Sequence, residues 1–190
     1  MKSLLIVFCI FPICVHSFAQ QKIVYKVVPI LAKESHFLNG GTKAEFGGKS
    51  RIYFEVSLPP NTVEWLYAIS TKKQQNQESA IGLASQVTKL ISPEIGIPST
   101  ILSAIITPKG EAVCDTYLFG DINNLNAFIS KTARFSYLMS GTRENIMEGK
   151  VQIQDFISGT YYLGVRNPSP LWGVQVTIEA VAIIKQIANN

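Results

Sequence analysis

The sequence predicts a mainly β fold, an antiparallel β-sandwich of jelly-roll-like type with a helical insertion around residues 78–105. Three observations carry this prediction. Apolar and polar residues alternate in short segments, turn residues separate roughly eight such segments, and one stretch in the middle of the chain changes to helical spacing. Short alternating strands bounded by Gly, Pro and Asn are typical of two antiparallel sheets packed face to face.

The first 19 residues predict a secretory signal peptide that is cleaved between Ala19 and Gln20. Lys2 precedes an apolar run over residues 4–15, and small side chains flank the cleavage point. This run is shorter than the roughly 20 residues that span a bilayer, so no transmembrane span is expected in the mature chain. The alternative is a lipoprotein acylated at Cys14, although the residues before it are not small.

The export signal predicts the compartment and simplifies the chemistry of the mature protein. We expect one domain over residues 20–190, exported to the periplasm, the cell surface or the medium. Cleavage removes Lys2 and no acid, so the formal net charge falls from +4 to +3. The basic residues are scattered rather than clustered, which predicts no nucleic-acid partner.

Cleavage also leaves few residues for metal or nucleophile chemistry. The mature chain keeps one cysteine, Cys114, and one histidine, His36. A zinc site needs three or four such ligands, and a catalytic triad needs a histidine beside its nucleophile. We therefore expect Cys114 to be buried and inert and His36 to be a surface or capping residue.

The strands follow from alternation and β-branched runs. Residues 51–58 place Ile52, Phe54, Val56 and Leu58 on one face, and the next strand, 63–69, follows a Pro-Pro-Asn turn as a hairpin or a crossing between sheets. The final strand, 173–184, alternates in the same way, with Gln175, Thr177 and Glu179 facing out. The other expected strands are 23–31, 112–119, 135–139, 150–156 and 160–165, and residues 33–49 are expected to form a glycine-rich loop.

The insertion at residues 72–110 differs from the rest of the chain. A polar linker is followed by apolar residues at helical spacing from residue 79 to 92, then by a second apolar stretch that ends at residue 107. The segment 79–107 either packs across a sheet or serves as an envelope-surface contact with a membrane or a partner. Its polar face carries little besides Lys89, whereas membrane-surface helices are usually rich in Lys and Arg, so packing is favoured.

Three segments resemble the bacterial pre-peptidase C-terminal domain, a secreted β-sandwich. They are RIYFEVSLPP at 51–60, CDTYLF at 114–119 and SGTYYLGV at 158–165. The insertion at 72–110 is a departure from that family, and no peptidase precedes the domain in this sequence. The resemblance implies a non-catalytic accessory role in binding or targeting.

The candidate ligand site is built on the two tryptophans. Trp172 follows a proline-rich turn, and Arg166 and Asn167 nearby could supply hydrogen bonds, so the sequence suggests a site where a sugar ring stacks on an aromatic face. Trp65 is the second candidate. The alternative is that both rings fill the core, and Trp65 is in phase with the apolar positions of its strand.

Carboxylates allow two further hypotheses. Asp115, Asp121 and Asn123, with Asn124, could supply oxygen ligands to calcium, the one cofactor that the sequence suggests, although Asp121 also fits an ordinary Asx turn. A small carboxylate-dependent hydrolase would need two acids across a cleft. The available acids are Glu55, Glu64, Asp115, Asp155 and Glu179, and solvated strand faces account for Glu55 and Glu179.

The sequence therefore favours an exported, non-catalytic module that binds a glycan or an envelope protein. The hydrolase and the envelope-surface protein that uses residues 79–107 remain the alternatives.

Overall fold

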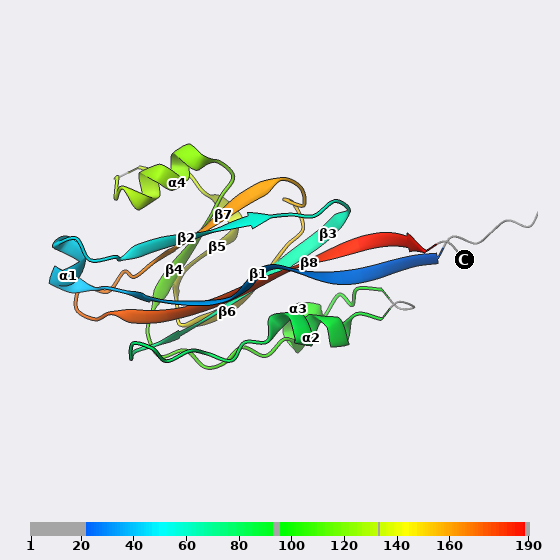
Figure 1. Cartoon of the computed structure of the whole chain (residues 1–190), viewed down its shortest axis with the longest axis horizontal. Helices are drawn as coiled ribbons and strands as arrows, with labels where there is room; N and C mark the ends of the chain where they lie inside the picture. The colour runs from blue at the N-terminus through cyan, green and yellow to red at the C-terminus, as the bar shows by residue number, and fades with distance from the viewer. Residues whose placement is uncertain (1–21, 93–95, 133, 189–190) are drawn as a thin grey trace, which may run out of the picture.

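The computed structural model describes residues 22–92, 96–132 and 134–188 and confirms the predicted β-sandwich (Figure 1). Two four-stranded antiparallel sheets pack face to face. Sheet A has the order β1-β8-β3-β6, and sheet B has the order β2-β7-β4-β5. The strands of sheet A are β1 (Lys22–Leu38), β8 (Val174–Ala188), β3 (Thr62–Lys72) and β6 (Glu148–Ile153). Those of sheet B are β2 (Arg51–Ser57), β7 (Thr160–Arg166), β4 (Cys114–Phe119) and β5 (Leu138–Ile146).

The described residues also form four short helices on the outside of the sandwich. The predicted helical insertion contains α2 (Leu83–Leu90) and α3 (Ile101–Ala104), while α1 (Gly41–Glu45) and α4 (Ile122–Ile129) lie near the left end of Figure 1. None of the helices in the described part of the chain has the length and apolarity to cross a membrane.

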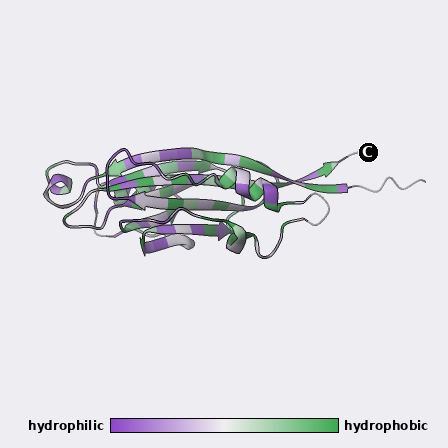
Figure 2. Ribbon diagram, turned by 90° about the horizontal axis from the view of Figure 1, so that it is seen from below, coloured by the Kyte–Doolittle hydropathy of each residue, from purple (hydrophilic) through white to green (hydrophobic). Residues whose placement is uncertain are grey.

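The alternating residues of β2, β3 and β8 form the core between the sheets. Figure 2 shows the layers of the sandwich edge-on. In β3, Trp65, Tyr67 and Ile69 point inward and are buried. The two neighbouring strands β2 and β3 belong to different sheets, so the turn at 58–61 is a crossing and not a hairpin.

Two expectations about strand limits were wrong. The predicted loop over 33–49 begins later, because β1 continues to Leu38 by pairing with β8 after two register shifts, and α1 forms inside the remaining loop. The predicted strand 135–139 instead begins at Leu138. Phe135 and Tyr137 pack against Tyr117, so their alternate spacing reflects an aromatic cluster rather than sheet pairing.

The insertion covers the outer face of sheet A. Its buried residues Leu83, Val87 and Ile101 pack on Leu66 and Val181 of the sheet. Most apolar side chains of the described residues 79–92 and 96–107 are therefore packed on sheet A, as the packing interpretation predicted, while Ile106 stays exposed.

Polar side chains of β8 hold the insertion in place. Gln175 accepts a hydrogen bond from the backbone NH of Asn76 (3.1 Å), and the Thr177 hydroxyl accepts one from Ser79 (3.1 Å). Glu179 accepts from the NH groups of Leu83 (2.9 Å) and of the next residue (3.0 Å) at the start of α2. These NH groups have no partner within the helix, so a carboxylate there satisfies them and also interacts favourably with the helix dipole. The outward face of β8, expected to be solvated, is thus buried beneath the insertion.

The outer face of sheet B is covered by α4. Phe128 of this helix packs against Tyr117 and Phe119 of β4, with ring centroids 5.5 and 5.3 Å apart. Gly164 of β7 makes this possible, because a Cβ there would lie 2.7 Å from Phe119 and 2.8 Å from Phe128.

Candidate functional site

A pocket of about 590 Å³ opens beside Trp172 at one end of the sandwich. It lies where β3 and β4 meet the loop between β7 and β8, so residues from both sheets form its walls. The lining residues are Lys73, Glu111, Ala112, Val113, Asn167, Ser169, Trp172, Gly173 and Val174. The pocket therefore combines aliphatic walls, one large aromatic ring and a few polar groups, which is the usual composition of a small-ligand site.

Asn167 fixes the loop that carries Trp172. Its side chain is buried, and its amide nitrogen donates to the carbonyl oxygens of Trp172 (2.8 Å) and Leu38 (3.3 Å). Its amide oxygen accepts from the backbone NH of Ser169 (2.9 Å). The predicted ligand residue Asn167 is therefore committed to the loop itself and positions Trp172 rather than offering its amide to a ligand.

Ser169 and two glycines complete the anchoring of this loop. The Ser169 hydroxyl accepts hydrogen bonds from the backbone NH groups of Leu171 (3.3 Å) and Trp172 (3.0 Å). A Cβ on Gly40 would lie 2.1 Å from the Trp172 carbonyl oxygen, and one on Gly41 would lie 2.5 Å from that of Pro170. The loop is held by hydrogen bonds and close backbone contact while the Trp172 residue stays 73% exposed. The backbone that carries its ring is held in place, which reduces the entropy lost on binding.

The charged groups of the pocket come from segments that are distant in sequence. The Glu111 carboxylate forms an ion pair with the ammonium group of Lys72 (2.8 Å) and accepts a hydrogen bond from the backbone NH of Lys73 (3.3 Å). The hydrogen bond from Lys72 lowers the pKa of Glu111, so the carboxylate is ionised at neutral pH. Sequence reasoning missed Lys73 and Glu111, because only the sheet order brings residues 73, 111 and 172 together.

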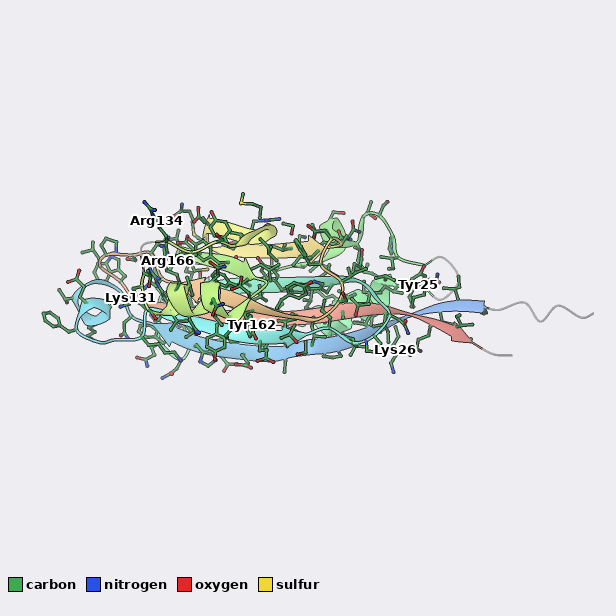
Figure 3. The ribbon with its side chains drawn as sticks, turned by 90° about the horizontal axis from the view of Figure 1, so that it is seen from above. Tyr25, Lys26, Lys131, Arg134, Tyr162 and Arg166 are labelled. Carbon is green, nitrogen blue, oxygen red and sulfur yellow. The ribbon has the colours of Figure 1, made fainter. Side chains whose placement is uncertain are left out.

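Arg166 lies outside this pocket, on the outer face of sheet B. Its Nε and Nη2 atoms lie 2.8 and 2.6 Å from a carboxylate oxygen of Asp115, and its guanidinium lies 5.5 Å from the ring centroid of Tyr117. Neighbouring residues of a strand point to opposite faces, which separates Arg166 from Asn167. Figure 3 shows Arg166 on the same side of the molecule as Lys131 and Arg134.

Trp65 is a core residue, as the alternative interpretation held. It is fully buried, it stacks on Tyr161 at 6.4 Å between centroids, and its indole NH donates to the carbonyl oxygen of Phe156 (2.9 Å). Trp65 and Trp172 therefore have different roles, and only Trp172 is available to a ligand.

The three proposed calcium ligands already have other contacts or lie apart from the pocket. Asp115 is paired with Arg166 and also accepts from the backbone NH of Asn145 (2.8 Å). Asp121 caps α4 by accepting from the backbone NH and the side-chain amide of Asn124, which lowers the pKa of Asp121. Asn123 is an exposed residue of α4. No group of three or more His, Cys, Asp or Glu among the described residues is placed to hold a metal. The calcium hypothesis stays a prediction, and these contacts do not favour it.

The carboxylates considered for hydrolysis are also dispersed. Glu64 is buried and accepts from the amides of Gln152 and Gln154 (both 2.7 Å), and Glu179 holds the insertion. Glu55 and Asp155 are exposed on separate elements. The pocket beside Trp172 contains one carboxylate, Glu111, among the residues that the structure describes. This arrangement does not provide the two facing acids that glycoside cleavage requires.

The remaining histidine and cysteine are placed as expected. His36 lies 3.0 Å from Glu34 and packs on Phe54, with ring centroids 5.5 Å apart, at the surface of β1. Cys114 is buried, and burial raises the pKa of its thiol to about 12. A protonated thiol without access to solvent is a poor nucleophile.

Comparison with known proteins does not add a family assignment. No protein-family model and no curated protein sequence matches the chain. The function must therefore be argued from the geometry of the pocket.

Proposed function

We propose that this chain is an exported, non-catalytic binding module and that its ligand is a carbohydrate held in the pocket beside Trp172. The observation that carries the proposal is the exposed Trp172 ring, fixed by Asn167 and Ser169 at the edge of a pocket with aliphatic walls. A large aromatic ring left in water on a rigid loop costs free energy that a ligand can recover by covering it.

The polar groups of the pocket suit a sugar. The carboxylate of Glu111 accepts hydrogen bonds from hydroxyl groups, whereas the ammonium group of Lys73 donates them. The C–H groups on one face of a pyranose ring can pack on the indole while the ring's hydroxyls reach these charged groups. The signal-peptide prediction and the resemblance to an accessory secreted domain support a role outside the cytoplasm.

The test is a glycan array read with the secreted protein and with Trp172→Ala. We expect the wild type to bind a restricted set of glycans and Trp172→Ala to bind them about tenfold more weakly, because one aromatic stacking contact is worth about 0.5–1.5 kcal/mol beyond the area it buries. Trp172→Phe should retain part of the affinity.

Leu171→Ala is the matched control for this experiment. Leu171 is 71% exposed and adjacent to Trp172, yet it does not line the pocket. It should bind glycans as the wild type does. An empty array with a folded wild-type protein would overturn the glycan proposal and favour an envelope protein as the ligand, and equal binding by Trp172→Ala would move the site elsewhere.

A further inference from the structure

The end of the sandwich that carries the pocket also presents three large apolar side chains to solvent. Phe46 is 89% exposed in the loop after α1, and Leu171 and Trp172 are 71% and 73% exposed in the loop between β7 and β8. We call this set of three residues the apolar tip. The two loops touch each other, because the backbone NH of Gly41 donates to the Ser169 carbonyl oxygen (3.3 Å). Both loops lie at the left end of Figure 1.

Hydrogen bonds hold the backbone of both loops. Asn167 and Ser169 hold the loop of Leu171 and Trp172 through its backbone. In the loop of Phe46, the backbone NH of Phe46 donates to the Thr42 carbonyl oxygen (2.9 Å). The backbone NH of Gly48 donates to the Lys43 carbonyl oxygen (2.7 Å). Exposure of the apolar tip is therefore a property of the fold rather than of a loose segment.

Lysines surround the apolar tip. Lys43 of α1 and Lys49 of the following loop flank Phe46 in sequence and are exposed, with Glu45 as the one acid between residues 40 and 50. The ammonium group of Lys131 donates to the carbonyl oxygen of Ala44 (2.7 Å), which brings a third cation to α1. Lys73 lies on the other side, at the wall of the pocket. Figure 3 shows Lys131 at this end of the molecule, with Arg134 close by.

We propose that the apolar tip inserts into the surface of an anionic lipid bilayer. Phe, Leu and Trp side chains bury their apolar area at the boundary between headgroups and acyl chains, where Trp is especially favoured. The surrounding lysines face lipid phosphates, and each contributes about 1 kcal/mol near an anionic surface. Phe46 and Leu171 are exposed on loops and do not line the pocket, and Trp172 is exposed at its edge. A fluid bilayer accommodates such a shape without a complementary partner surface.

This proposal shares Trp172 with the glycan proposal, but Phe46 and Leu171 belong to the apolar tip alone because they do not line the pocket. It also differs from the earlier hypothesis of membrane contact through residues 79–107, whose apolar face is buried on sheet A. The inference is therefore specific to one end of the sandwich and to two loops.

The experiment is co-sedimentation of the secreted protein with vesicles. Vesicles of phosphatidylglycerol and phosphatidylcholine should pellet the wild type, and vesicles of phosphatidylcholine alone should pellet much less. Added salt should weaken the binding, because it screens the lysines. The double variant Phe46→Ser/Leu171→Ser should lose about tenfold in partitioning for each side chain removed. A vesicle-dependent blue shift of tryptophan emission should accompany binding and reports on Trp172, since Trp65 is buried in the core.

Ile106→Ser is the matched control. Ile106 is 76% exposed and belongs to the insertion, so its replacement removes a similar exposed apolar area away from the apolar tip. We expect it to pellet as the wild type does. Thermal melting of each variant checks that the fold is retained.

Three results would overturn the proposal. The first is a wild type that stays in the supernatant with anionic vesicles, including the case in which it forms dimers through this end. The second is a double variant that pellets as well as the wild type. The third is a loss of binding in Ile106→Ser equal to that of the double variant. The double variant should still bind glycans on the array, so failure of vesicle binding and failure of the glycan proposal are separate outcomes.

Discussion

The insertion over 79–107 and the loop over 167–173 use the same physical device with opposite results. In both regions, polar side chains that lie in β8 or just after β7 form hydrogen bonds to the backbone of a neighbouring segment. Thr177 and Glu179 hold the insertion so that its apolar side chains lie on sheet A. Asn167 and Ser169 hold the loop so that Leu171 and Trp172 stay in water.

This difference shows that apolar content alone does not identify an interaction surface. The insertion is the more apolar segment in sequence, but its apolar face is already used by the fold. The short loop contains few apolar residues, yet its anchoring keeps them from packing. A large apolar side chain that the fold prevents from burying is the stronger indication of a binding role.

Leu83→Ala should cause the largest effect, because it removes a fully buried side chain from the packing between the insertion and sheet A. We expect the free energy of unfolding to fall by about 2–5 kcal/mol, measured by urea denaturation. Ser85→Ala, at an exposed position of the same helix, should change it little. A cost for Leu83→Ala no greater than that of Ser85→Ala would mean that the insertion does not pack as described.

Glu179→Ala should have the next largest effect, because it leaves one buried and one partly buried NH group at the start of α2 without their acceptor. The expected loss is about 1–3 kcal/mol in the free energy of unfolding. Glu179→Gln keeps one acceptor oxygen and should lose less. Glu55→Ala, an exposed glutamate of β2, is the control. Equal losses for Glu179→Ala and Glu55→Ala would contradict the anchoring role of Glu179.

Asn167→Ala should have a smaller effect on stability and a larger one on the ligand site. It removes two hydrogen bonds to the loop and one to Leu38 of β1, but solvent near the pocket can replace part of them, so we expect a loss of about 1 kcal/mol. Time-resolved fluorescence anisotropy should show faster motion of Trp172, and glycan affinity should fall with it. Asn123→Ala on α4 should leave both unchanged. Unaltered Trp172 motion in Asn167→Ala would show that the loop is held by other contacts.

The sequence predicts the sandwich well, because apolar and polar side chains must alternate along each strand that has one face on the core. Residues Val174, Val176 and Ile178 of β8 point inward as expected. The outward residues of β8 were expected in solvent and are buried, since the segment that covers them lies about 95 residues earlier in the chain. Strand periodicity indicates which side chains share a face, but it does not indicate what packs on that face.

The ligand site could be predicted only in part for a related reason. Trp172 was singled out because a large ring in a proline-rich turn is unusual, and it is exposed beside the pocket. Arg166 was assigned to the same site by its proximity in sequence, although its side chain points to the other face and pairs with Asp115. The partners that do line the pocket, Lys73 and Glu111, come from other strand ends, and local patterns contain no information about this tertiary arrangement.

Cys114 offers a comparison of the two regions that leaves the stability at neutral pH nearly unchanged. Its pKa rises from 9.0 to about 12 through burial, so the unfolded chain ionises at lower pH than the folded one. The free energy of unfolding should therefore decrease as pH rises from about 9 toward 12, and Cys114→Ala should remove this contribution to the slope. At neutral pH the Cys114 thiol should react with iodoacetamide only through opening of the structure. Cys114 begins β4 next to the pocket wall at Ala112 and Val113, so Asn167→Ala should accelerate labelling more than Glu179→Ala does. Faster labelling in Glu179→Ala would show that the insertion, and not the loop of Trp172, controls opening at this end of the sandwich.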